Sequence, residues 1–184
     1  MVVSAALLIR ERGAHATAIS DVLEHSGAPR GSAYHYFPGG RTQLLCEAVD
    51  LAGEHVAGII TEAAGSLELL DTLIEKYRQQ LLDSDFRAGC PVVAVAVEAG
   101  EERERTASVT ERAAAAFDRW TDLIAQRFIT DGLPADRATE LAVLATSAIE
   151  GAILLARVRR DLTPLDVVHR QLRNVFRTEK GSPR

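Results

Sequence analysis

The stretch that decides the fold is ATAISDVLEHSGAPRGSAYHYF, residues 16–37. Its first half places Ile19, Val22 and Leu23 on one side of a helix, and Gly27 follows as the kind of residue that commonly ends one. After the turn Ala-Pro-Arg, a second and shorter helical segment ends in three aromatic residues and a histidine. The pattern predicts two short helices joined by a tight turn.

Two such helices are the usual architecture of a helix-turn-helix DNA reader. The second helix presents short or polar side chains to base edges, and its neighbours contact phosphates. Arg30 and Ser32 suit bases or phosphate, the hydroxyls of Tyr34 and Tyr36 suit phosphate oxygens, and Phe37 has no polar group and should be core. The candidate DNA-binding residues are Thr17, Arg30, Gly31, Ser32, Tyr34, His35, Tyr36 and Arg41.

Thr17 and Arg41 are assigned from their positions at helix starts. Thr17 is the expected N-cap of the first helix of the pair. Arg41 opens a long helix, where free amide groups and a cation together favour a phosphate. Two alternatives stay open, because Tyr36 could pack in the core and His35 could be an exposed spacer.

The rest of the chain is also predicted to be helical, so we expect an all-α protein of about nine helices. The stretch PVVAVAVEAG resembles a strand, but a lone strand would have no partner for its backbone groups, and we expect a short buried helix with Pro91 at its first position. The expected helices cover residues 3–12, 18–26, 29–36, 41–64, 67–82, a short segment from 91, 102–130, 134–160 and 164–177.

The run from residue 5 to residue 49 resembles the amino-terminal domain of TetR-type transcriptional regulators. The specific part is the ending Tyr-His-Tyr-Phe. The Pro-Gly-Gly that precedes Arg41, together with GCPVVAVAVEAG further on, is similar to the LmrA/YxaF-type branch. The resemblance implies a DNA-binding domain at 1–45, a ligand-binding and dimerisation domain at 46–180, and release from operator DNA, as a repressor, when a small molecule binds.

Charge is unevenly distributed, which permits a DNA partner despite a net charge of −5. Residues 1–50 contain four basic and five acidic residues, and residues 51–156 contain nine basic and eighteen acidic residues. Residues 157–184 contain eight basic and three acidic residues. The arginines of the basic end are a rival DNA footprint, but cations near helix ends also complement the helix dipole, and we favour that interpretation.

The two last predicted helices are candidates for dimerisation. Small and apolar residues lie almost all round residues 134–160, so this helix has to be covered from more than one side. Residues 164–177 add a stripe with Leu165, Leu172 and Phe176. Together they could cover the core and meet a second copy, which gives a homodimer with an isologous two-fold interface.

A pocket in the second domain would hold an apolar or aromatic effector. Its candidate residues are large or polar and stand on helices that should line the interior. Glu150 is the sharpest of them, because a carboxylate in an apolar stretch needs a partner when buried, although a salt bridge within the protein would also serve. The candidate ligand-binding residues are Tyr77, Phe86, Cys90, Phe117, Trp120, Ile124, Ser147 and Glu150.

Catalysis, metals and cofactors are not expected. The five histidines form no pair at metal-ligand spacing on one helix, and no nucleophile set or phosphate loop appears. Cys90 at a helix start could sense oxidants, but a buried packing thiol is favoured there and at Cys46. A helical carrier or enzyme, or a structural protein without a ligand, are the alternatives to a DNA-binding regulator.

The cytoplasm is the expected location. The amino end has neither the basic region nor the cleavage site of a signal peptide. In addition, no apolar run approaches the ~20 residues of a membrane span. We therefore expect no membrane partner.

Overall fold

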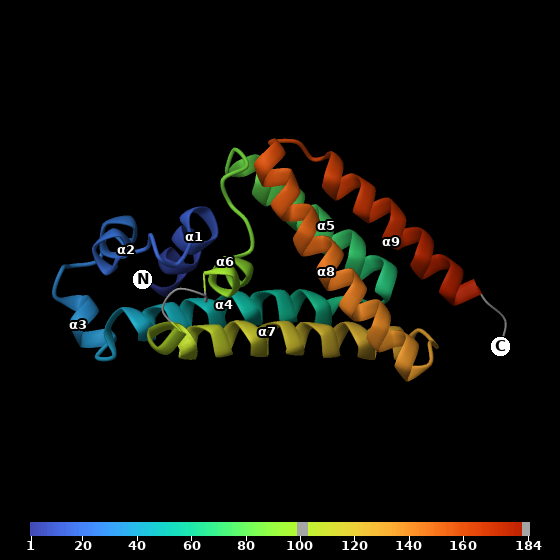
Figure 1. The fold of residues 1–184 in the computed structure, drawn as a ribbon, viewed down its shortest axis with the longest axis horizontal. Helices are drawn as coiled ribbons and strands as arrows, with labels where there is room; N and C mark the ends of the chain where they lie inside the picture. The colour runs from blue at the N-terminus through green and yellow to red at the C-terminus, as the bar shows by residue number, and fades with distance from the viewer. Residues whose placement is uncertain (99–102, 182–184) are drawn as a thin grey trace. The chain divides into compact units, whose positions relative to one another are not determined.

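The computed structural model describes residues 1–98 and 103–181, and within these ranges the chain is all helical, with no strand. This confirms the predicted fold class (Figure 1). In chain order the helices are α1 (Val2–Arg12), α2 (Ile19–Ser26), α3 (Ser32–Tyr36), α4 (Gly40–Glu62), α5 (Ser66–Asp83), α6 (Pro91–Val97), α7 (Arg103–Thr130), α8 (Ala135–Arg159) and α9 (Thr163–Gly181).

The valine-rich segment is a short helix, α6, as predicted, but it is buried on one side only, since Val97 is 74% exposed. Pro91 occupies its first turn, where a missing N–H costs nothing because the first amides of a helix have no partner inside it. Val92 and Val95, one helical turn apart, are both buried. The expected start of the next helix, Glu102, lies outside the described residues.

The chain divides into two compact units. Unit 1 comprises Met1–His55 and Arg87–Ala116. In it α6 packs on α1, and the Gly89 N–H donates to the Arg10 carbonyl at 2.7 Å. The first parts of α4 and α7 are joined by an ion pair of 2.6 Å between Asp50 and Arg112. Its core contains Ala5, Ile9, Val22, Ala33, Phe37, Leu44, Leu45, Ala48, Val49, Val92 and Val95.

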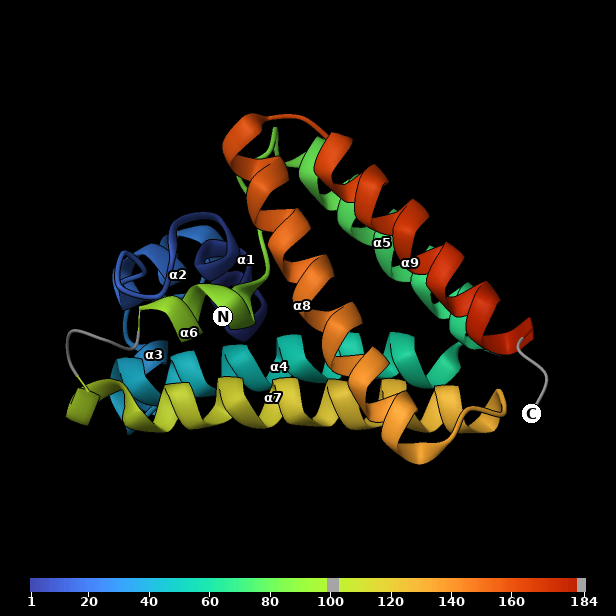
Figure 2. The ribbon, with the colours of Figure 1, turned by 45° about the vertical axis from the view of Figure 1, so that its right-hand side comes forward.

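Unit 2 comprises Val56–Phe86 and Phe117–Arg184. Helices α5, α8 and α9 lie side by side in both views (Figures 1 and 2). The rings of Phe128 on α7 and Phe176 on α9 meet edge to face with centroids 4.7 Å apart. At the start of α5, the Ser66 N–H donates to Asp131 at 3.0 Å, which satisfies one of the first amides of the helix.

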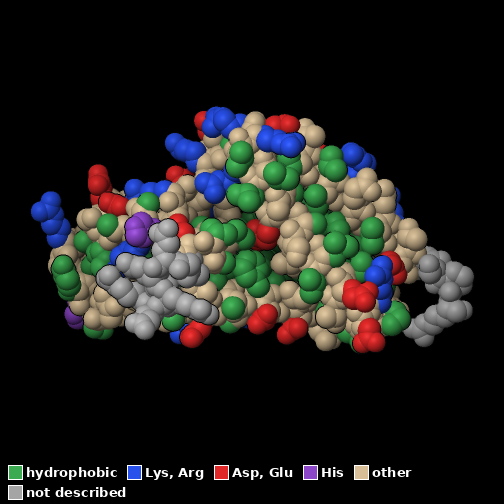
Figure 3. All heavy atoms as spheres, in the orientation of Figure 1, with side chains coloured by type: hydrophobic (Ala, Val, Ile, Leu, Met, Phe, Trp, Pro, Cys, Tyr) green, Lys and Arg blue, Asp and Glu red, His purple; other side chains and the backbone are tan. Residues whose placement is uncertain are grey.

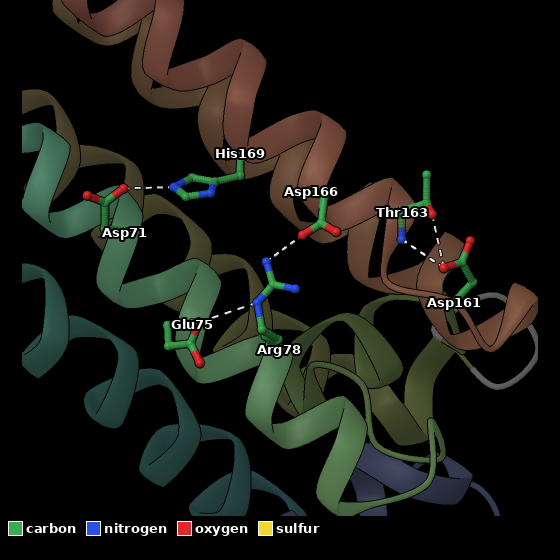
Figure 4. Close-up of polar contacts among 7 residues, drawn as sticks. All are labelled: Asp71, Glu75, Arg78, Asp161, Thr163, Asp166 and His169. Atoms are coloured by element: carbon green, nitrogen blue, oxygen red, sulfur yellow. Dashed lines mark hydrogen bonds and ion pairs between the residues drawn. The ribbon is translucent and has the colours of Figure 1, made fainter.

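Ion pairs join α5 to α9 within unit 2 (Figure 4). Arg78 on α5 contacts Asp166 on α9, and Asp71 accepts from His169 at 2.7 Å and also pairs with Arg173. Burial acts to raise the pKa of Asp71, but the hydrogen bonds from Arg173 and His169 outweigh it and hold the pKa below its ordinary value. The ionised carboxylate is therefore the form that holds the two helices together.

Helix α8 corrects one expectation. By length and composition it could cross a membrane, with a mean hydropathy of 1.8 in its most apolar window, of which 39% is buried. The expectation that no apolar run approaches such a length was wrong, because the Leu, Ile and Val residues along α8 give it a high mean hydropathy despite a few charged residues. One side of α8 packs on α5 and α9, as in the core helix of a folded domain.

Candidate DNA interface and interior cavity

The turn between α2 and α3 is built by local hydrogen bonds. Gly27 adopts a left-handed conformation, with φ 67° and ψ 15°, that a glycine adopts without strain. The N–H groups of Gly27 and Ala28 donate back to Glu24 and Leu23, which ends α2. The Ser32 hydroxyl donates to the Pro29 carbonyl at 2.6 Å and so stands at the start of α3.

Helix α3 presents a polar and aromatic face to solvent. Tyr34 is 80% exposed and Tyr36 63% exposed, whereas Ala33 and Phe37 are buried. Phe37 is therefore core, as predicted, and the alternative of core packing for Tyr36 is not supported by its exposure. The rings of His35 and Tyr36 meet edge to face at 5.1 Å. Arg30, Gly31 and His35 are exposed as well, and Ser32 is half-buried.

Thr17 makes its contacts inside the protein. The side chain is 1% exposed, and its hydroxyl donates to the Gly13 carbonyl at 2.7 Å. The expectation that Thr17 caps α2 was wrong, because the N-cap is Ala18, whose N–H donates to the Asp21 carboxylate at 3.2 Å. A phosphate contact from Thr17 stays a prediction.

Arg41 is also engaged within the protein. Its guanidinium donates to three backbone carbonyls of the α1–α2 loop: Thr17 at 3.0 Å, His15 at 3.3 Å, and Ala14. A guanidinium carries five N–H donors, so one side chain can satisfy all three carbonyls at once. In this structure Arg41 fixes the loop that leads into α2, and its phosphate contact stays a prediction.

Glu98, just after α6, holds the same loop from another side. Its carboxylate accepts the His15 N–H at 2.6 Å and lies against Gly13, which has φ 88° and ψ 164°. A Cβ on Gly13 would overlap the Glu98 Oε1 atom. Sequence reasoning missed Glu98, and no local pattern could have found it, because it lies 83 residues from His15 in the chain.

The candidate ligand-binding residues of unit 2 surround two neighbouring spaces. A small cavity of about 20 Å³, partly open, touches Tyr77, Trp120, Ile124 and Glu150. An open groove of about 310 Å³ touches Phe117, Ser147 and Glu150. Both spaces share Thr146, which the sequence reasoning did not name, and Glu150.

Phe86 and Cys90 do not line these spaces. Phe86 lies beside the end of α8, with the Arg160 guanidinium 5.9 Å from its ring centroid. Cys90 is 5% exposed and belongs to unit 1, where it precedes α6. Neither residue is a contact of the cavity as the structure stands.

Several arginines of the basic carboxy end form ion pairs within the protein. Arg160 pairs with Asp85 at 2.6 Å, and this hydrogen bond raises the pKa of Arg160. With the contact between Arg173 and Asp71, intramolecular pairing accounts for part of the predicted basic end. In the described part of the chain, no group of three or more His, Cys, Asp or Glu side chains could hold a metal ion.

Comparison with known families matches most of the chain. Residues 2–48 match the model of bacterial regulatory proteins of the tetR family. Residues 66–171 match the carboxy-terminal domain of LmrA/YxaF-like transcriptional regulators.

Individual proteins agree. An uncharacterised HTH-type transcriptional regulator of Mycobacterium tuberculosis is 81% identical, over 97% of this chain and 93% of its own length. The regulator YxaF of Bacillus subtilis is 31% identical over 92% and 89%. A TetR transcriptional regulator from Legionella pneumophila has a TM-score of 0.83 over 95% and 94% of the two chains, and at 19% identity it shows the fold alone.

Proposed function

Because this chain belongs to the TetR family of bacterial transcriptional regulators, we propose that it is a repressor released from operator DNA by a small-molecule effector. DNA-binding regulation itself follows from the family, and the relatives are regulators rather than enzymes. Regulators of this family bind operator DNA and dimerise. The repressor role, the effector and the dimer interface of this chain are the proposed part.

The observation that carries the DNA contact is the two-sided character of α3. Ala33 and Phe37 fix the short helix to the core, while Tyr34, His35 and Tyr36 stand in solvent. A recognition helix needs this division, because one side must hold it in position and the other must reach the major groove. Arg30, beside the start of α3, adds an exposed positive charge.

The test uses one charge on the proposed interface and one outside it. Replacing exposed Arg30 with alanine removes a phosphate or base contact, so DNA affinity falls and the slope of log affinity against log salt decreases by about one. Replacing exposed Lys76 on α5, outside the proposed DNA and dimer contacts, is the control and leaves both unchanged. Equal affinities for the two variants in a band-shift titration would exclude Arg30, beside the start of α3, as a DNA contact.

The proposed dimer forms through α8 and α9. Apolar side chains remain at the surface of α8, and Figure 3 shows hydrophobic groups on the face where Figure 1 draws this helix. In a two-fold dimer the two recognition helices would lie about 34–36 Å apart, in successive major grooves. The exposed apolar residues of these helices are Val143, Leu144, Leu154, Leu155, Val158 and Val167.

The effector would bind at the cavity and groove of unit 2. The effector releases the protein from DNA if it binds the DNA-free state more tightly than the DNA-bound state, a difference typically worth about 1–3 kcal/mol. Residues 1–45 would act as the DNA-binding part and 46–180 as the effector and dimerisation part. The cytoplasm, where the operator DNA is, is the proposed location.

A further inference from the structure

Two polar side chains stand in the wall that the cavity and the groove of unit 2 share. From them we propose that the effector is an amphiphilic organic cation, with a protonated amine at Thr146 and Glu150 and an apolar tail along the groove. This inference deepens the proposed function and rests on it.

The Thr146 hydroxyl is the first indication of a polar ligand. Five other helical threonines donate to the carbonyl four residues earlier, at 2.8–3.1 Å: Thr61, Thr121, Thr130, Thr139 and Thr178. Thr146 does not, and its Oγ1 atom is buried without a hydrogen-bond partner among the described residues. A buried hydroxyl left in this state costs about 1–3 kcal/mol, which a ligand donor or water at this position would recover.

Glu150 gives the site its charge. It follows Thr146 by one helical turn, so both side chains lie on one face of α8. Of the described residues that line the two spaces, it alone is charged. Glu150 also has a contact within the protein, but an ionised carboxylate offers about four acceptor positions and can take a ligand N–H in addition.

The remaining wall suits the other parts of such a ligand. The small cavity of about 20 Å³ holds little more than one water-sized group, the size of an ammonium. Phe117 and Trp120 meet edge to face at 5.3 Å, and aromatic rings attract cations through their faces. The open groove of about 310 Å³ has the volume for a short apolar tail.

Trp120 makes the site measurable. It is the one tryptophan in the sequence, is 2% exposed and lines the cavity. Three probes share a phenylbutyl tail and differ in the head: phenylbutylamine, phenylbutanol and phenylbutyrate. The amine is protonated at neutral pH, because its pKa lies near that of lysine, about 10.4. Tryptophan-selective fluorescence titration of the full-length protein should give saturable binding in the order amine, alcohol, carboxylate.

Three variants locate the preference. Glu150→Gln should weaken amine binding roughly tenfold and leave alcohol binding within about twofold, because only the charged hydrogen bond is lost. Thr146→Val, which removes the hydroxyl at nearly constant shape, should weaken amine binding roughly threefold. Glu140→Gln is the matched control, since Glu140 is an exposed carboxylate on α8 outside both spaces. Circular dichroism and the denaturant midpoint confirm that each variant is folded.

The inference is overturned if the wild type binds the alcohol or the carboxylate as tightly as the amine, or if folded Glu150→Gln keeps the preference for the amine. Failure of the proposed function has a different result. In that case the wild type would bind the amine with the expected dependence on Glu150 and yet bind no DNA duplex at low salt. If only neutral aromatic compounds released the protein from its operator, the proposed function would stand and the proposal of a cationic effector would be overturned.

Discussion

Replacing Gly13 with alanine tests how the loop before α2 is held. The residue has φ 88° and ψ 164°, a conformation that is essentially restricted to glycine. The added Cβ would also meet the Glu98 carboxylate, whose Cδ atom would be 3.2 Å away and whose Oε1 would be closer. That carboxylate accepts the His15 N–H at 2.6 Å, so the substitution strains the backbone and displaces a hydrogen-bonded partner together.

The two effects give an expected loss of about 2–5 kcal/mol in the free energy of unfolding. Backbone strain in this region costs about 1–3 kcal/mol. The lost hydrogen bond to a charged acceptor adds about 1–2 kcal/mol, reduced by the room that the carboxylate has to rotate. Gly27→Ala is the control, because Gly27 also has a positive φ of 67° but no atom lies near its Cβ position. We expect a loss of about 1 kcal/mol there.

Urea unfolding followed by circular dichroism measures these losses, and a Glu98→Ala background separates the two causes. Without the carboxylate the collision disappears and only the strain remains, so Gly13→Ala should cost about 1–3 kcal/mol in that background. The reasoning is refuted if Gly13→Ala costs no more than Gly27→Ala, or if its cost is the same with and without Glu98.

Three further outcomes follow from contacts described above. Arg41→Lys should lower stability by roughly 1–3 kcal/mol in urea unfolding, because a lysine cannot reach three carbonyls together; an unchanged midpoint would contradict the role of the guanidinium in the loop. Asp71→Asn should cost no more than about 1 kcal/mol at neutral pH, since the side chain is 43% exposed. The folded pKa of Asp71 is depressed below 3.8, so the stabilisation by its ion pairs is present above that value and is lost as pH falls through the folded pKa. The stability difference between Asp71→Asn and wild type should therefore disappear in acid. A constant difference across that pH range would contradict the role of the ionised carboxylate. Leu154→Glu should convert the dimer to a monomer in light scattering, whereas Leu82→Glu, at a similarly exposed leucine on α5, should not; a wild type that is monomeric at micromolar concentration would rule out the interface.

The local patterns of the sequence were enough to predict the fold. Helical periodicity predicted α2, and Gly27 predicted where it ends. The lack of a partner strand predicted that the valine-rich segment is the helix α6. The aromatic side chains in and after α3 lie where their polarity predicts, because apolar Phe37 is buried and Tyr34, with its hydroxyl, is exposed. The end of α2 and the division of the α3 side chains depend on residues that are close in the chain, and α6 depends only on the lack of a second strand pattern, which is why one sequence sufficed.

Some features that the sequence did not reveal depend on contacts between distant residues, and others depend on unusual local geometry. Arg41 was assigned to phosphate because its position at a helix start allows it, but the loop carbonyls 24 to 27 residues away compete for the same donors. Thr146 was overlooked because a threonine in a helix ordinarily donates to its own backbone. Phe86 has a positive φ of 59°, and such a turn cannot be read from an aromatic residue.

The packing of α6 and its flanking residues on the α1 region has a practical consequence for chimaeric regulators. A graft that transfers only the first 48 residues to another sensor would leave Gly13 and His15 without Glu98, and the Arg10 carbonyl without the Gly89 N–H. The transplanted reader would then have to find replacements for both contacts in its new host. Chimaeras that transfer the α6 segment together with the amino-terminal helices should retain the DNA specificity of this protein, whereas chimaeras with only the first 48 residues should lose it.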